Sequence, residues 1–321
     1  MDKNICLTCD NNYVRHCIVT MLSVVESSGS NYLFHLIVDG SLSKDNKKKL
    51  SSFISSSQLN IKLYEVDTSI LKGVQFRKTR PLTEAAYLRV LMSSILDSSI
   101  HTVLYLDCDI LVVNDISPIF DLDISDYALA ATKDITNRKD PHRFQIQLPY
   151  MEPYFCSGMM YVNLDYWRDN NSEKALVNFS KREREVFFHD QDALNYVFKG
   201  KWYRLSPKWN KFYPIFYDKT FFENSEDYYH FERNPMIIHF YHYFKPWNKF
   251  YWYGRKWRKY QKYYLKLLAE TPWKDYPLNN SHSKEWESVR MLLSYSTKKG
   301  FDNFGLLWLY DLIVSLKNIF R

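Results

Sequence analysis

Two aspartates, Asp107 and Asp109, stand one residue apart inside the otherwise apolar run at residues 104–113. A run this rich in aliphatic and β-branched residues is typical of a buried strand in a parallel sheet. Because residues i and i+2 of a strand point to the same side, the two carboxylates converge. Two buried like charges without a counter-charge would be strongly destabilising. The pair therefore predicts a bound cation, for which a divalent metal ion is the simplest candidate.

The elements that must position these carboxylates alternate between strand and helix. We expect strands at residues 4–9, 32–38, 60–66 and 101–113, and helices at residues 11–27, 44–55 and 84–96. Asp10 or Asn11 would cap the first helix. Such alternation predicts the α/β class with a doubly wound, mostly parallel sheet. Ligands of this architecture bind beyond the carboxyl ends of the strands, where Asp10 and the aspartate pair fall.

The chain offers no glycine-rich loop for phosphates. It has eight glycines, and neither a G-x-G-x-x-G nor a P-loop sequence occurs. A nucleotide bound by this fold would need a metal ion and cationic side chains to neutralise its phosphates. Further along the chain, we expect a strand at residues 158–163, helices at 172–179 and 190–198, and strand and loop at 200–214.

Cysteine usage and hydropathy bear on the compartment. Five cysteines, an odd and scattered set, suit a reducing compartment. Cys6 and Cys9 form a C-x-x-C sequence, but on a strand they face opposite sides, and no second pair would complete a zinc site. No apolar run is long enough to span a bilayer, and no signal segment precedes the first predicted strand. We therefore expect a cytoplasmic protein.

The Asp-Cys-Asp sequence at residues 107–109 resembles the D-x-D motif of nucleotide-sugar-dependent glycosyltransferases. Further segments occur in the order typical of glycosyltransferase family 8, which includes lipopolysaccharide galactosyl- and glucosyltransferases and glycogenin. These segments are residues 8–13, 86–89, 155–158 with 163–164, 189–195 and 239–247. The last contains the sequence Lys-Pro-Trp at residues 245–247. The resemblance covers residues 4–250 and rests on the ordered set rather than on the D-x-D motif alone.

The resemblance implies a single Rossmann-like nucleotide-binding domain of the GT-A type and a UDP-hexose donor. It also implies that Asp107, Asp109 and His239 hold Mn²⁺ or Mg²⁺. Both ions prefer oxygen ligands, and Mn²⁺ readily accepts an imidazole. Such an ion would offset the charge of the departing nucleoside diphosphate. The alternative for His239 is a core histidine at the end of a strand.

The resemblance also assigns the contacts of the donor. Asp10 and Asn12 would hold uracil and ribose, Thr8 and Cys9 would contribute main-chain contacts, and Arg89 would lie near the sugar and the diphosphate. The other donor-site residues are Cys108, Asp134, Cys156, Ser157, His242 and Lys245. The last of these would pair with the diphosphate as a point charge. The alternatives are a helix cap for Asp10 and a solvated helix face for Arg89.

Asp190 and Gln191 are the reactive candidates. Members of the family retain the anomeric configuration, which requires a nucleophile on the far face of the sugar or front-face attack within an ion pair. Because an amide is a poor nucleophile, Gln191 better suits stabilising the oxocarbenium ion or orienting the acceptor, although the nucleophilic role stays open. Asp190 and Asp134 would hold donor hydroxyls.

The chain departs from the family pattern at two places. Relatives often carry Asn-Ala-Gly where this chain has Cys156, Ser157 and Gly158, so one sugar-contacting amide is missing. Relatives also carry glycine three residues after the metal histidine, where this chain has His242. That side chain would either clash with phosphate or bind it. The identity of the transferred hexose is therefore left open.

A basic, aromatic segment follows the predicted catalytic domain of residues 1–250. Residues 235–321 carry 15 Lys and Arg against 6 Asp and Glu. No nucleic-acid-binding motif accompanies them, so no nucleic-acid partner is expected. Aromatic rings interleaved with cations suit an anionic membrane surface. We expect residues 251–321 to form a helical extension whose end, 303–321, packs on the core or on a membrane.

The sequence thus predicts a metal-dependent, retaining transferase that moves galactose or glucose from a UDP-sugar to a hydroxyl of a glycan, glycolipid or glycoprotein. The composition favours bacterial cell-surface polysaccharide assembly. One alternative is a catalytically silent nucleotide- or glycan-binding scaffold of the same fold, which Cys156 and His242 favour. Another is an Asp-x-Asp phosphohydrolase, although Ile110 and Leu111 stand where such enzymes carry Gly and Thr or Val.

Overall fold

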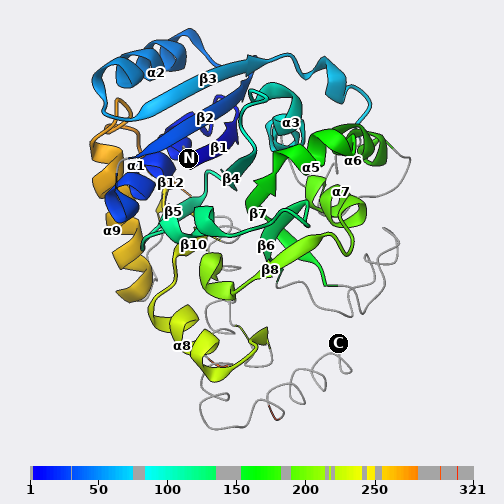
Figure 1. Ribbon diagram of the computed structural model, residues 1–321. Coiled ribbons are helices and arrows are strands. Elements are labelled where there is room, and N and C mark those ends of the chain that lie inside the picture. Colours follow the sequence, from blue (N-terminus) through cyan, green and yellow to red (C-terminus); the bar gives the residue numbers. More distant parts are fainter. Residues whose placement is uncertain are drawn as a thin grey trace, which may run out of the picture.

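The computed structural model describes residues 3–29, 31–74, 84–134, 153–181, 189–213, 217, 221–240, 244–249, 255–280, 297 and 309 (Figure 1). No helix in these ranges is long and apolar enough to cross a membrane. Two of the expected features, His242 and the helix at 303–321, fall on residues that lie outside the described ranges, apart from the single residue 309.

The central sheet has seven strands and is mostly parallel. From edge to edge they are β3 (Asn60–Val66), β2 (Tyr32–Asp39), β1 (Lys3–Cys9), β4 (Thr102–Leu106), β7 (Phe155–Asn163), β6 (Leu129–Lys133) and β8 (Trp202–Leu205). Among these strands only β7 runs antiparallel to its neighbours, which are β4 and β6. The predicted α/β class with a mostly parallel sheet is confirmed.

Helices cover both faces of this sheet, which explains the near-continuous burial of its inner strands β2, β1, β4, β7 and β6. In β1, Ile5 and Leu7 pack on one face, whereas Cys6 packs on the other. The face of Ile5 is covered by α1 (Val14–Ser28), α2 (Lys44–Ser56) and α9 (Arg255–Ala269). The face of Cys6 is covered by the segments η2 (Glu84–Leu91), α3 (Met92–Ile95), α5 (Leu164–Asp169), α6 (Ser172–Ser180) and α7 (Asp190–Val197).

A second sheet of three strands lies beside the first. Its order is β5 (Ile110–Val112), β10 (Ile237–Phe240) and β9 (Lys211–Tyr213). The remaining elements are the 3-10 turns η1 (Thr68–Leu71), η3 (Ser117–Asp121) and η4 (Pro207–Trp209), the helix α8 (Ser225–Arg233), and the short pair β11 (Asn248–Lys249) and β12 (Asn279–Asn280).

Helix α9 (orange in Figure 1) lies beside α1 (blue) and shares its core. Its side chains Tyr264, Leu267 and Leu268 are buried, whereas Arg258 and Lys262 are exposed. The apolar side of α9 is therefore occupied by the protein itself. The boundary predicted at residue 250 stays a prediction.

The expectation of one continuous strand at residues 101–113 is wrong. Strand β4 ends at Leu106, and β5 begins at Ile110 in the other sheet. Asp107 N still donates to Gly158 O of β7 at 2.8 Å, whereas Asp109 O accepts from Phe240 N of β10 at 3.0 Å. The chain thus changes sheets between the two aspartates, and their carboxylates lie in a turn rather than on one strand face.

The expected helix at residues 84–96 is also different. Residues 84–91 form a 3-10 turn, and only 92–95 are α-helical. Nearly every side chain from Ala85 to Ser93 is buried, so this segment is packed on all sides instead of on one stripe. Such all-round packing can override a local preference for the α-helix.

Candidate active site

Asp107, Asp109 and His239 come together where β4 ends beside β10. One ligand atom from each lies within 4.8 Å of the others, and no other such group of His, Cys, Asp or Glu occurs among the described residues. His239 Nε2 lies 3.1 Å from Asp109 Oδ1 and 3.9 Å from Asp107 Oδ2. Two carboxylates with one imidazole form a donor set that suits Mn²⁺ or a similar divalent ion.

The imidazole of His239 is held in a defined orientation. Its Nδ1 lies 3.0 Å from Asn210 Oδ1, and its ring stacks on Phe212 with centroids 4.6 Å apart. Because an amide oxygen only accepts hydrogen bonds, Nδ1 donates to Asn210, and Nε2 is the ring nitrogen directed toward the carboxylates. Asn210 is only 2% exposed. Sequence reasoning missed this residue, since no local pattern marks it.

Gly158 of β7 leaves the space that the cluster needs. A β-carbon at this position would lie 2.4 Å from His239 Cε1 and 2.8 Å from Asp107 Oδ2. Any larger residue would therefore displace two of the three candidate ligands. The requirement for glycine here comes from this close approach and not from an unusual backbone conformation.

Two cationic side chains balance the carboxylates. Lys245 Nζ pairs with Asp109 Oδ2 and also donates to Phe240 O. Burial raises the pKa of Asp109, but Lys245 and His239 outweigh burial and hold that pKa well below its usual range. Arg89 Nη1 lies 2.9 Å from Asp107 Oδ1. In this structure protein groups alone thus keep Asp109 ionised.

Arg89 also connects the cluster to Asp190. Its Nε lies 3.1 Å from Asp190 Oδ2, although the Nε hydrogen is directed to Ala86 O at 2.9 Å. The contact with Asp190 is therefore ionic rather than a well-aligned hydrogen bond. Burial raises the pKa of Asp190 to about 6, while Arg89 opposes the shift. Arg89 is 7% exposed, so the alternative of a solvated helix face is excluded.

The side chain of Gln191 is engaged at both ends. Its Oε1 accepts from Ser157 N at 2.9 Å, and its Nε2 donates to Asp134 Oδ2 at 3.3 Å. Asn195 Nδ2 donates to Gln191 O at 2.9 Å and anchors the first turn of α7. The buried residue His189, which directly precedes α7, has a φ of 52°. This is a strained conformation for a residue with a side chain. The amide of Gln191 is consequently fixed before any ligand binds.

A pocket of about 140 Å³ opens beside this cluster at the carboxyl ends of β1 and β4. Its lining residues are Thr8, Cys9, Asp10, Tyr13, Ala85, Ala86, Arg89, Tyr105, Asp107, Cys108 and Asp109. The position beyond the strand ends is the one expected for ligands of this architecture. The hydroxyl of Tyr105 lies 3.1 Å from Thr8 Oγ1 and donates to Asp107 Oδ1 at 2.8 Å. Sequence reasoning missed Tyr105 as well.

Asp10 performs a structural task at the rim of this pocket. Its Oδ1 accepts from the backbone N–H groups of Asn12 at 2.8 Å and Tyr13 at 3.1 Å. These bonds close the turn before α1, which starts at Val14 with Tyr13 as its N-cap and without a side-chain cap, so the predicted helix cap at Asp10 or Asn11 is wrong. Asn12 is exposed and does not line the pocket. The second oxygen of Asp10 has no hydrogen bond among the described residues and is available for a ligand.

The other predicted site residues lie close to the cluster without lining this pocket. They are Asp134, Cys156, Ser157, Asp190, Gln191, His239 and Lys245. Cys156 is buried, its Sγ accepts from Gly158 N at 3.4 Å, and burial raises its pKa well above the usual range. His242 lies outside the described residues. The structure therefore gathers the predicted side chains around one pocket, apart from His242.

Known proteins share both the sequence pattern and the fold. General stress protein A of Bacillus subtilis (strain 168) is 31% identical over 274 residues, which cover 82% of this chain and 92% of that protein. A lipopolysaccharide 1,2-glucosyltransferase of Escherichia coli (strain K12) is 28% identical over 279 residues, which cover 85% and 79%.

The crystal structure of the galactosyltransferase LgtC in complex with donor and acceptor sugar analogs matches this fold with a TM-score of 0.67 at 21% identity, covering 84% of this chain and 96% of LgtC. This likeness confirms the predicted GT-A fold. The family described as "Glycosyl transferase family 8" matches residues 4–250, the range over which the motifs resemble that family. The chain therefore belongs to glycosyl transferase family 8, and its activity is the transfer of a glycosyl group.

Proposed function

We propose that the chain moves galactose or glucose from a UDP-sugar to a hydroxyl of a glycan, glycolipid or glycoprotein acceptor, with retention of the anomeric configuration. The observation that carries this proposal is the group of Asp107, Asp109 and His239 beside a pocket at the strand ends. A nucleoside diphosphate needs positive charge on both sides, and Arg89 and Lys245 flank the carboxylates.

The residues of the cluster fit a divalent metal, Mn²⁺ or Mg²⁺. His239 Nε2 faces the carboxylates of Asp107 and Asp109, and Gly158 keeps the space next to them open. When bound, such an ion acts as a Lewis acid toward the diphosphate leaving group. Asp107 and Asp109 would hold it, and Asn210 would keep the proton of His239 on Nδ1 so that Nε2 stays free to ligate.

Lys245 would change partners when donor and metal bind. In the structure its ammonium neutralises Asp109. Because a metal ion would take over that task, the ammonium becomes available for the diphosphate, to which it binds as a point charge. Arg89, buried between Asp107 and Asp190, would stay in place and keep both carboxylates oriented.

Asp190 and Gln191 would act on the donor sugar from the first turn of α7. The amide oxygen of Gln191 already accepts from Ser157 N, so its lone pairs are partly committed. This favours a role in orienting the acceptor or stabilising the oxocarbenium ion over a role as nucleophile. Asp190 and Asp134 would hold hydroxyls of the hexose, with Ser157 and Cys156 contributing to the wall behind the sugar.

The experiment that tests this function measures UDP release from a panel of nucleotide sugars, with Mn²⁺ and with a chelator. We expect slow hydrolysis of one UDP-hexose that requires both Mn²⁺ and Asp109. Asp109→Asn should lose it, whereas Asp126→Asn, at an exposed aspartate, should behave like the wild type. Metal and UDP binding without turnover of any donor would instead favour the silent scaffold.

We also propose a cytoplasmic location with peripheral attachment to the inner face of a bacterial plasma membrane. The exposed side of α9 carries Arg258, Lys259 and Lys262, and each such cation contributes about 1 kcal/mol of attraction to anionic lipid. Since Tyr264 faces the core, this proposal relies on charge more than on insertion of aromatic rings. A lipid-linked or cell-surface glycan acceptor would be found at that membrane.

A further inference from the structure

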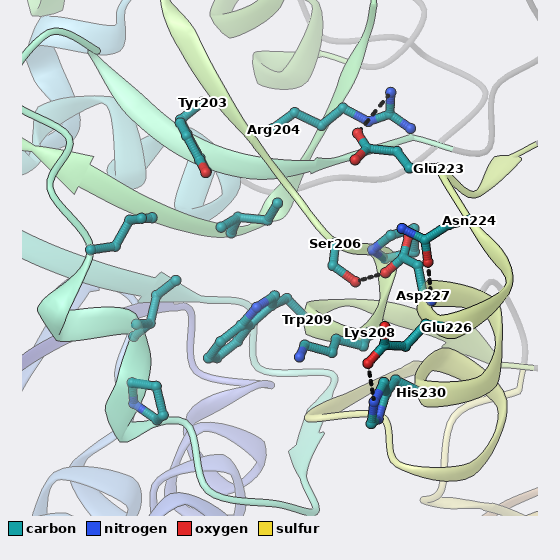
Figure 2. A pocket seen from close by; sticks show the side chains of 15 residues that line it. Tyr203, Arg204, Ser206, Lys208, Trp209, Glu223, Asn224, Glu226, Asp227 and His230 are labelled. Atoms are coloured by element: carbon teal, nitrogen blue, oxygen red, sulfur yellow. Dashed lines mark hydrogen bonds and ion pairs between the residues drawn. The ribbon is translucent and has the colours of Figure 1, made fainter.

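A second pocket lies away from the donor site, between η3, the end of β8, η4 and the first turns of α8 (Figure 2). Its volume is about 500 Å³, within the range of about 300 to 1,000 Å³ that holds small organic ligands. It shares no lining residue with the donor pocket. Its occupant would therefore be a different part of the substrate or a different molecule.

The lining of this pocket combines aromatic rings with polar groups. Trp209 lies centrally in Figure 2 and is 9% exposed, and Tyr203 stands at the rim with 37% of its surface exposed. Trp209 Nε1 has no hydrogen-bond partner in the part of the chain that the structure describes, nor has the ammonium of Lys208. Two residues of the lining thus carry donors that have no partner among the described residues.

The carboxylates of the pocket, by contrast, are already engaged. Asp227 accepts from the hydroxyl of Ser206, Glu226 lies 3.7 Å from His230, and Glu223 lies 3.7 Å from Arg204. These acidic groups do not converge on a common point, because the described residues hold no metal-ligating group apart from the one in the active site. Mixed, mutually compensated charge disfavours both a metal ion and a phosphate-rich polyanion as the ligand.

We propose that this pocket binds a neutral oligosaccharide, namely a part of the acceptor glycan remote from the reacting hydroxyl. A pyranose ring offers an apolar face of C–H groups, which suits the exposed ring of Tyr203, and hydroxyls at its edge. Those hydroxyls accept from donors such as Lys208 Nζ and donate to carboxylates that keep free lone pairs, such as Glu226. The proposal rests on the proposed function only in naming the glycan as an acceptor.

The pocket is connected to the active site through the chain itself. Trp209 lines the pocket, and the next residue, Asn210, holds the metal-site histidine. Both precede β9, which pairs with β10, the strand that carries His239. A glycan in this pocket would thus lie next to the segment that supports the candidate metal cluster. This arrangement suits a long acceptor glycan that binds in this pocket through a part remote from its reacting hydroxyl.

An array of neutral and charged oligosaccharides, probed with the full chain, tests this site. We expect capture of neutral glycans. The captured glycan is then titrated against purified variants by calorimetry. Tyr203→Ala and Lys208→Ala should each weaken its binding about tenfold, a loss typical of one important contact. Tyr229→Ala provides the matched control, because Tyr229 is exposed on α8 and does not line the pocket.

The outcomes separate this site from the active site. Asp109→Asn should bind the glycan as the wild type does while losing UDP release. Capture of no neutral glycan, or binding that Tyr203→Ala and Lys208→Ala leave unchanged, would overturn the proposal even if UDP release is intact. Glycan binding that depends on Tyr203, in a protein that hydrolyses no UDP-sugar, would support the pocket and count against the proposed function alone.

Discussion

Replacing Gly158 with alanine tests how closely the candidate metal cluster is packed. The added β-carbon would lie 2.4 Å from His239 Cε1 and 2.8 Å from Asp107 Oδ2, whereas carbon contacts are stable at about 3.5 Å or more. The imidazole would therefore have to move by about 1 Å. It cannot do so freely, because Phe212 stacks on its ring and Asn210 holds its Nδ1.

The expected effect has two parts. Overpacking a buried site costs about 1 to 3 kcal/mol, and each kcal/mol lowers the Tm of a chain of this size by roughly 2 to 4 °C. Displacing a ligand by about 1 Å should weaken Mn²⁺ binding by about 10- to 100-fold, as does disturbing the groups that orient metal ligands. Both effects arise from the same two contacts, so they should appear together.

The assay combines thermal unfolding in chelator with Mn²⁺ titration in the presence of UDP, followed by electron paramagnetic resonance of the free ion. Gly40→Ala is the matched control, since a β-carbon there meets nothing within 4 Å. Gly40→Ala should leave Tm and Mn²⁺ affinity unchanged. Wild-type Mn²⁺ affinity and stability in Gly158→Ala would refute the packing argument and the placement of the metal.

Three further predictions follow from the site and its surroundings. Asn210→Ala removes the hydrogen bond to Nδ1 of His239 and should weaken Mn²⁺ binding about 10- to 100-fold in the same titration. An unchanged Mn²⁺ affinity would show that Asn210 does not orient His239. Because the pKa of Asp190 is raised to about 6, its contribution to stability is present below the unfolded pKa and is lost as pH rises through 6. Thermal unfolding in chelator should therefore show Asp190→Asn gaining about 2 kcal/mol of stability relative to the wild type between pH 4.5 and 7.5, and curves that stay parallel would contradict this. Substituting Glu for the three exposed cations of α9, Arg258, Lys259 and Lys262, should abolish flotation of the protein with anionic liposomes. If the unmodified chain also fails to float with them, membrane attachment is refuted.

The elements with strong periodic or apolar patterns were predictable from the sequence. The strand expected at residues 60–66 is β3, and the strand expected at 32–38 is β2 with one more residue. Strand β2 is buried almost throughout, whereas β3 at the sheet edge buries only Ile61, yet in both the hydrophobic pattern and turn residues mark the strand. The segment at 84–96 failed because packing on all sides removes the one-sided stripe on which a helix prediction depends.

The strand through residues 101–113 failed for a different reason. Its composition is continuous across Asp107 and Asp109, so nothing local shows that hydrogen bonding passes from β7 to β10 between them. The change of sheet depends on partners more than 40 residues away in the sequence. The two aspartates nevertheless converge, because a turn between two sheets brings them together as effectively as one strand face would.

The residues of the site were also predictable only in part. The carboxylates, the cations and His239 were predictable, because residue type and the resemblance of ordered segments indicate their chemistry. Asn210, Tyr105 and the space at Gly158 were not, because each acts through a contact made in three dimensions. An asparagine before a short strand looks like any turn residue until the histidine 29 residues later folds onto it. The sequence pattern does not show the contacts that orient the imidazole of His239 and that set the spacing of the candidate ligands. These two properties decide whether the group can hold a metal ion.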